Sequence, residues 1–68
     1  MNIFTQRLKE LRKERGLSIP ELSAKAKIPQ QTIHVWERGE REPSMGSIIK
    51  LCRFFGCTSD FLIGLTPD

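Results

Sequence analysis

The sequence predicts a small all-α domain, a compact bundle of five short helices with a helix-turn-helix at the second and third. Apolar residues recur three or four positions apart in successive segments. Capping residues or glycines stand at the ends of these segments. No alternating strand pattern, internal repeat or low-complexity segment interrupts them. The 68 residues leave room for one domain. We therefore expect a single domain over residues 1–68, with an ordered core over about residues 3–65.

The first expected helix ends near Arg15. Phe4, Leu8 and Leu11 recur at i, i+4 and i+7, with charged residues between them. Gly16 follows directly, as glycine often does where a helix stops. This helix therefore has one apolar face and one charged face.

The second expected helix begins after Ser18. The segment Ser18-Ile19-Pro20-Glu21 combines a capping serine, a proline in the first turn and a glutamate that can reach back to the serine. Leu22 and Ala26 supply its apolar side. The segment Lys27-Ile28-Pro29 ends it, because the residue before a proline disfavours the helical conformation.

The third expected helix lies between Pro29 and Gly39 and has two distinct faces. One face carries Ile33, Trp36 and Glu37 at i, i+3 and i+4. The opposite side carries a stripe that a purely structural helix does not need, made of Gln31, His34, Val35 and Arg38. Glutamine can donate and accept hydrogen bonds at once, as an adenine edge requires, and arginine suits guanine or phosphate.

Two further helices complete the chain. Ser44 is a good N-cap for the fourth helix and Gly56 ends it. Thr58 can cap a fifth helix of about two turns, with Asp60 near its N-terminus. Phe61, Leu62 and Ile63 supply its apolar surface. The residues expected on the buried side of the fourth helix are Met45, Ile48, Leu51, Cys52 and Phe55.

Charge and composition restrict the location and chemistry of the chain. The net charge is +3, and residues 1–27 carry +4 of local charge against −1 in the remainder, which permits a polyanionic partner.

No apolar run is long enough to span a membrane and no cleavable signal is present, so we expect a cytoplasmic protein with no membrane association. Cys52 and Cys57 then remain small core thiols. His34 is the only histidine, and no metal site or cofactor is expected.

Two helices joined by a tight turn, the second with a polar outer stripe, describe a helix-turn-helix. An ordered set of residues then resembles the Cro/repressor-type (Xre-like) DNA-binding domain family over about residues 3–65. The resemblance implies the all-α fold of phage-repressor DNA-binding domains. The residues that carry it are Leu8-Lys9-Glu10-Leu11-Arg12, Gly16-Leu17-Ser18, Glu21-Leu22, Thr32-Ile33, Trp36-Glu37-Arg38-Gly39, Arg41-Glu42-Pro43-Ser44, Leu51 and Leu62-Ile63-Gly64.

The resemblance also implies roles for individual residues. The helix Gln30–Arg38 is expected to enter the major groove, where the positions of Gln30, Gln31 and Val35 face base edges; periodicity adds His34 to this surface. In the alternative reading, the two glutamines are only solvated residues of the first turn. Trp36 belongs to the core rather than to a base stack. The candidate phosphate contacts are Ser18, Lys27, Thr32, Arg38 and Arg41.

One residue pair and three single positions affect how the third expected helix is held in the fold. Arg12 and Glu37 resemble the family's ion pair between the first and third helices. Ile19 stands where the family often has a glutamine that grips a phosphate. Lys27 stands where a glycine commonly makes the turn, and a left-handed lysine costs roughly 1 kcal/mol. Pro29 replaces the usual serine or threonine cap, an acceptor worth about 1 kcal/mol.

The sequence thus predicts a sequence-specific transcriptional regulator, a repressor of bacterial or phage type that binds double-stranded DNA as a homodimer. Phe54, Phe61 and Leu65 are the candidate dimer surface, although Phe54 could instead only cover the core. The alternative is a protein-interaction module, such as the antitoxin of a toxin-antitoxin pair. No small-molecule ligand is expected. No enzymatic activity is expected either, because paired carboxylates, a nucleophile with its base and a glycine-rich phosphate loop are all missing.

Overall fold

The computed structural model describes residues 2–66, so positions 1, 67 and 68 of the expected domain lie outside the described residues. The described chain forms five helices and no strand, which confirms the predicted fold class. Each expected helix is present and begins or ends within a residue or so of the predicted position. The helices are α1 (Ile3–Glu14), α2 (Ile19–Ala26), α3 (Gln30–Glu37), α4 (Met45–Phe55) and α5 (Ser59–Ile63).

Side-chain caps start four of the five helices. The side-chain oxygens of Asn2, Ser18, Ser44 and Thr58 each accept a hydrogen bond from the backbone N–H three residues later. Each cap satisfies one of the helical N–H groups that have no partner inside the helix. The caps at Ser18, Ser44 and Thr58 were predicted, whereas Asn2 was not. Only α3 begins without a side-chain cap.

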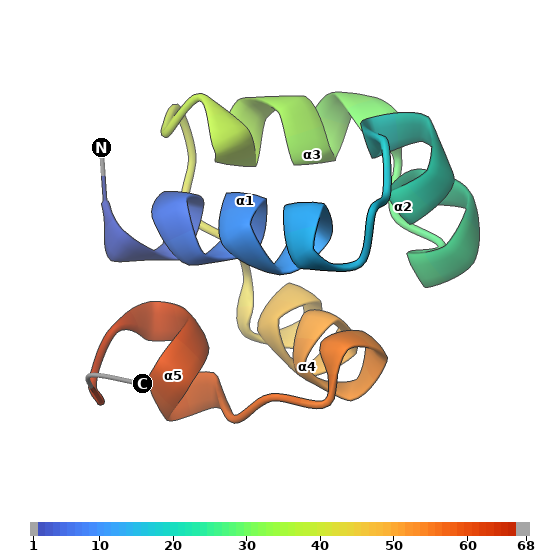
Figure 1. The fold of residues 1–68 in the computed structure, drawn as a ribbon. Helices are drawn as coiled ribbons and strands as arrows, with labels where there is room; N and C mark the ends of the chain where they lie inside the picture. Colours follow the sequence, from blue (N-terminus) through green and yellow to red (C-terminus); the bar gives the residue numbers. More distant parts are fainter. Residues whose placement is uncertain (1, 67–68) are drawn as a thin grey trace.

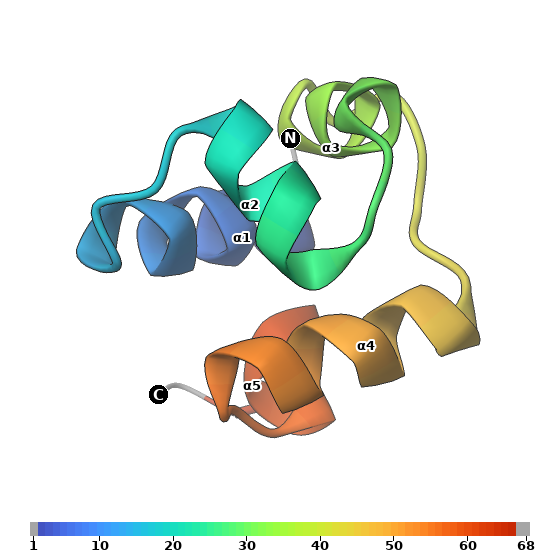
Figure 2. The ribbon, with the colours of Figure 1, turned by 90° about the vertical axis from the view of Figure 1, so that its right-hand side faces the viewer.

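The helices pack in two layers, with α1, α2 and α3 in one and α4 and α5 in the other (Figure 1 and Figure 2). Figure 1 shows α3 along one edge of the molecule, α1 beside it, and α4 and α5 on the far side of α1. Figure 2, turned by 90°, shows the same separation of α1, α2 and α3 from α4 and α5. The core lies where the layers meet. Each helix places one fully buried aliphatic side chain there, and these are Leu8, Leu22, Ile33, Leu51 and Leu62.

Arg7 of α1 and Arg15, which directly follows this helix, hold the second layer. Arg7 Nη1 donates to the carbonyl oxygen of Phe61 at 3.0 Å, and Arg15 Nη2 donates to that of Phe55 at 2.7 Å. Each guanidinium also lies over the ring of the same phenylalanine, with Cζ 4.1 Å and 5.5 Å from the two ring centroids. Cations at carboxyl-terminal carbonyls complement the helix dipole. Arg7 and Arg15, which supply part of the positive charge of the N-terminal half, therefore stabilise the fold.

The expectation that Met45 lies on the buried side of α4 was wrong, because its side chain is 78% exposed. Ile63, which was expected to supply apolar surface on α5, is 40% exposed. Figure 2 shows that the first turn of α4, which begins with Met45, extends past α1 and α2. Helix α5 contains five residues, fewer than the expected two turns, because Gly64 adopts a left-handed φ of 86° and ends it.

Candidate nucleic-acid interface

Helix α3 presents the expected polar face at the edge of the molecule. Gln30, Gln31 and His34 are exposed and Val35 is half-buried. The opposite face is buried and is formed by Ile33, Trp36 and Glu37. Figure 1 shows that no other helix covers the outer side of α3. The structure therefore brings all four candidate base-contacting residues together on one accessible helix.

Contacts with α1 fix the carboxyl end of α3. Thr5 Oγ1 donates a buried hydrogen bond to the carbonyl oxygen of Trp36 at 2.6 Å. The Phe4 and Trp36 rings meet edge to face, with centroids 5.8 Å apart, a preferred arrangement for aromatic pairs. Trp36 is 3% exposed. It is a core residue and is not available to stack on a base.

Arg12 and Glu37, which were expected to pair, form a bidentate ion pair between α1 and α3. Arg12 Nε lies 2.7 Å from Glu37 Oε2, and Arg12 Nη2 lies 3.0 Å from Oε1. Arg12 Nη1 also donates to the carbonyl oxygen of Leu17 at 2.9 Å. The side chains are only 14% and 8% exposed. The hydrogen bond to Glu37 raises the pKa of Arg12 above its ordinary value, and the pair holds the orientation of α3.

The turn between α2 and α3 contains the two unfavourable features expected from the sequence, a left-handed lysine and a helix start without a side-chain cap. Lys27 is the only non-glycine residue with positive φ among the described residues, at φ 59° and ψ 48°. A left-handed residue with a side chain costs roughly 1 kcal/mol. Pro29 offers α3 no side-chain acceptor, and its carbonyl oxygen receives the N–H groups of Thr32 and Ile33. The turn is held by Ser23, whose hydroxyl donates to the carbonyl oxygen of Ile28.

A shallow hollow beside α3 gathers several candidate contacts. It is lined by Gln31, Thr32, Val35, Glu40 and Arg41. Four of these residues were predicted from the sequence, but the acidic Glu40 was not. Glu40 lies in this hollow because of how the chain turns after α3. The local sequence pattern does not predict that turn.

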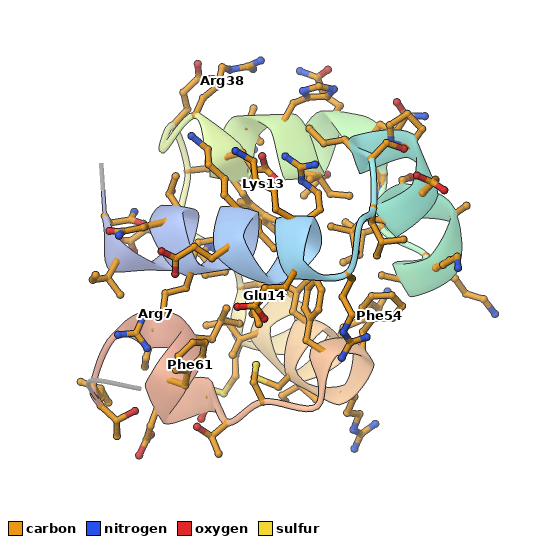
Figure 3. The ribbon with its side chains drawn as sticks, viewed as in Figure 1. Arg7, Lys13, Glu14, Arg38, Phe54 and Phe61 are labelled. Carbon is orange, nitrogen blue, oxygen red and sulfur yellow. The ribbon has the colours of Figure 1, made fainter. Side chains whose placement is uncertain are left out.

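Arg38 lies at the carboxyl end of α3, and Figure 3 shows its side chain at the outer edge of the molecule. Its Nε lies 2.8 Å from Glu40 Oε2. Both side chains are about half exposed, at 51% and 54%. The candidate phosphate contact is thus already paired with a carboxylate.

A second hollow lies between the α2–α3 turn and the start of α4. Its lining includes two candidate phosphate contacts, Lys27 and Thr32, together with Lys50. Lys50 Nζ donates to the carbonyl oxygen of Lys27 at 3.2 Å. Sequence reasoning missed Lys50 because its proximity to the turn depends on how α4 packs in the fold.

Ser18 occupies the start of α2 and has a capping role. Its Oγ accepts from the Glu21 N–H at 3.2 Å, and Glu21 Oε1 accepts from the Ser18 N–H at 2.9 Å. This hydrogen bonding to Ser18, first from its backbone, lowers the pKa of Glu21 below its ordinary value. Both residues are exposed. A phosphate approaching Ser18 therefore also meets the carboxylate of Glu21.

The structure does not bring Phe54 and Phe61 into one patch. Figure 3 shows the two side chains well apart. Phe61 lies under the guanidinium of Arg7, and Phe54 packs edge to face on Phe55, with ring centroids 5.0 Å apart. Both are half-buried, and only Leu65 of the three expected dimer residues is strongly exposed, at 71%.

Three of the exposed apolar side chains instead line a groove between α4 and α5. Met45 and Ile49 on α4 and Ile63 on α5 are its exposed members. We call this surface the α4–α5 apolar face. It is lined by Pro43, Met45, Ile48, Ile49, Ser59 and Ile63.

Neither a metal site nor a membrane-spanning helix is found in residues 2–66. No group of three or more His, Cys, Asp or Glu side chains lies in position to hold a metal ion in this part of the chain. None of its helices has the length and apolar character needed to cross a bilayer. Cys52 and Cys57 are both free and half-buried.

Known proteins resemble this chain in sequence and in fold. A family model described as helix-turn-helix matches residues 8–62. The chain is 29% identical over 66 residues to the uncharacterized HTH-type transcriptional regulator YobD of Bacillus subtilis, covering 97% of this chain and 59% of that protein. It is 36% identical over 61 residues to the HTH-type transcriptional regulator DdrOP3 of Deinococcus deserti, covering 88% and 47%.

A solved structure shares the architecture. The crystal structure of a transcriptional regulator from Listeria innocua superimposes with a TM-score of 0.82 at 26% sequence identity, covering 96% of this chain and 61% of that one. The chain spans about half the length of the curated relatives it matches.

Proposed function

The chain belongs to the helix-turn-helix family of DNA-binding transcriptional regulators, and we propose that it binds duplex DNA sequence-specifically with α3 in the major groove. The observation that carries the proposal is the pair of faces on α3. Gln30, Gln31 and His34 are exposed, while the opposite face is buried and tied to α1 through Trp36 and Glu37. A helix that is anchored to the core by one face and exposes polar side chains on the other suits readout of base edges.

Base recognition is assigned to the first two turns of α3. A glutamine can make a bidentate contact to adenine, worth about 1 to 3 kcal/mol of discrimination, and Gln30 and Gln31 begin the helix. His34 lies on the same exposed surface. Val35, which is half-buried beside Gln31, is suited to contact with a thymine methyl group.

Contacts to phosphate are assigned to the two hollows that flank α3 and to Arg38. Arg41 lines one hollow, and Lys27 and Thr32 line the other. Arg38 lies outside both hollows, at the carboxyl end of α3. Lys50 joins the second group, because it reaches the carbonyl of Lys27. Ser18 is the remaining candidate. These contacts supply affinity and register rather than sequence preference.

The regulator acts in this proposal as a repressor that occludes DNA from polymerase, and it binds as a two-fold dimer. One such domain makes few base contacts, and dimers on near-palindromic sites double them. We assign the dimer contact to the α4–α5 apolar face. None of its lining residues carries a charge, so a two-fold axis, which sets the same surface of two copies against each other, brings no like charges together there.

Selection of bound sequences from a random duplex pool tests the proposal directly. We expect an enriched near-palindrome whose half-sites lie about one DNA turn apart. Gel shifts with the selected duplex then separate the two kinds of contact. Gln30→Ala and Gln31→Ala should each reduce the preference for the selected sequence, by roughly 5- to 150-fold at the base concerned.

Arg38→Ala is the matched control for these glutamine variants. Because it removes a phosphate contact, it should weaken binding to all duplexes by a similar factor. If both glutamine variants keep the full sequence preference while Arg38→Ala weakens binding, the assignment of base readout to Gln30 and Gln31 is wrong. If the pool yields no enriched sequence, the proposal of specific DNA binding fails.

A further inference from the structure

The two cysteines stand at the two ends of the turn that terminates α4. The carbonyl oxygen of Cys52 accepts hydrogen bonds from the backbone N–H groups of Gly56, at 2.8 Å, and Cys57, at 3.1 Å. Gly56 between them adopts the left-handed conformation, with φ 71°. The bond from Cys57 back to Cys52 spans six residues, as in the Schellman motif, in which the side chains of these two positions meet.

The turn geometry sets the side chains of Cys52 and Cys57 on the same side of the chain. Both side chains are half-buried and pack against the hydrophobic core. Burial, followed by the proximity of Cys57, raises the pKa of Cys52 to about 11. Neither thiol takes part in the proposed DNA contacts.

We propose that Cys52 and Cys57 form a reversible modification site, in which a small-molecule disulfide oxidises the two thiols to an intramolecular disulfide. The thiolate is the attacking species in this chemistry. At neutral pH the raised pKa makes Cys52 the slower nucleophile, so the first attack on the oxidant falls to Cys57. That step forms a mixed disulfide and releases one small thiol.

Cys52 completes the reaction from its position beside Cys57. Its sulfur attacks the Cys57 sulfur of the mixed disulfide and displaces the second small thiol. In total, two S–H bonds of the protein are lost and one S–S bond forms. The oxidant takes up two electrons and two protons and leaves as two thiols. A reducing thiol pool reverses the reaction.

The fold favours this bond because the turn already holds the two residues together. A disulfide between them closes a ring of six residues and joins the end of α4 to the residue before Thr58, the cap of α5. If the disulfide fits the native geometry, folding makes its formation more favourable. By linkage, the disulfide raises the free energy of unfolding by the same amount. The disulfide should therefore form more readily in the folded chain than in the unfolded one.

A redox titration compares these two states in the same chain. The protein is equilibrated with mixtures of reduced and oxidised glutathione, in buffer and in concentrated urea. Free thiols are then blocked by alkylation and the products are separated by mass. We expect an intramolecular disulfide, seen as loss of two hydrogens without alkylation. Its equilibrium constant should be at least about tenfold larger in buffer than in urea.

The urea sample is the matched control, because the ring size and both cysteines are identical. Cys52→Ser provides the second control, since it should stop at a glutathione adduct on Cys57. An equilibrium constant in buffer that is less than about tenfold above that in urea overturns the proposal. Oxidation that gives only glutathione adducts or disulfide-linked dimers in the folded protein overturns it as well.

Discussion

Arg38 and Glu40 form an exposed ion pair at the carboxyl end of α3, with Nε 2.8 Å from Oε2 and Nη2 3.3 Å from Oε1. An exposed pair of this kind contributes little to stability. Its position is more important, because Glu40 also lines the hollow beside Gln31 and Arg41. Under the proposed function, the carboxylate competes with DNA phosphate for the guanidinium of Arg38.

The first prediction is that Glu40→Gln strengthens DNA binding. The change releases Arg38 and removes a negative charge near the phosphates, so we expect affinity to rise by about 3- to 10-fold at low salt, with a smaller gain at high salt. Fluorescence anisotropy with a labelled duplex measures this. Glu42→Gln is the control, because Glu42 has no ion pair among the described residues. Equal gains in the two variants would show that net charge, and not release of Arg38, is responsible.

The second prediction concerns the pair that holds α3 to α1. Arg12→Met leaves the Glu37 carboxylate buried without its partner and should lower the free energy of unfolding by about 3 to 5 kcal/mol. Arg38→Met, which breaks the exposed pair, should lower it by less than about 1 kcal/mol. Urea titration compares them. The double variant Arg12→Met/Glu37→Met should recover most of the lost stability; a double variant as unstable as Arg12→Met would contradict the explanation.

The third prediction separates stability from DNA binding at Lys27. Lys27→Gly relieves the left-handed strain and should raise the free energy of unfolding by about 1 kcal/mol. It also removes a proposed phosphate contact, so DNA affinity should fall. The slope of the logarithm of affinity against the logarithm of salt concentration should become shallower by about one unit. Lys27→Asn should act in the same directions, because asparagine tolerates this conformation. Unchanged affinity and slope in both variants would remove Lys27 from the interface.

The fourth prediction concerns pH and the cap of α2. Hydrogen bonds to Ser18 place the pKa of Glu21 in the folded state below the ordinary 4.5. The ionised form therefore stabilises the fold above the ordinary pKa, and this contribution is lost as pH falls through the lower folded value. Glu21→Gln keeps an acceptor but does not ionise. Thermal melts between about pH 5 and pH 3 should show a shallower loss of Tm in this variant than in the parent; equal slopes would exclude the effect.

The fifth prediction tests the dimer surface. Met45→Glu introduces a charge into the α4–α5 apolar face and, because Met45 is 78% exposed, should leave the fold intact. Leu65→Glu places the same charge at a residue that is 71% exposed and outside the face. Sedimentation at micromolar concentration with duplex DNA should show dimers for Leu65→Glu and monomers for Met45→Glu. The reverse result would move the interface to Leu65.

The helices could be predicted because their signals are local. Ser18 with Glu21, and likewise Ser44 and Thr58, act on N–H groups three residues away, so the sequence alone determines these starts. The left-handed Lys27 and the uncapped Pro29 were expected from the family resemblance, which places a glycine and a capping residue at these positions. The two faces of α3 follow from periodicity.

Other features depend on packing that sequence spacing does not encode. Periodicity assigned Met45 to the buried face of α4, but it could not show that the first turn extends beyond the core. Phe54 and Phe61 were grouped by their apolar character, whereas the fold directs them to Phe55 and Arg7. Glu40 and Lys50 enter the two hollows only because of tertiary contacts.

The hydrogen bonds of α3 to α1 are all at one end of the helix. Thr5 and Arg12 hold Trp36 and Glu37, while the start at Pro29 has no side-chain cap. A small rotation of α3 about its fixed end would move Gln30 far more than Arg38. We therefore expect the domain to tolerate variation in groove width at the bases nearest Gln30, but to require a constant phosphate spacing at Arg38.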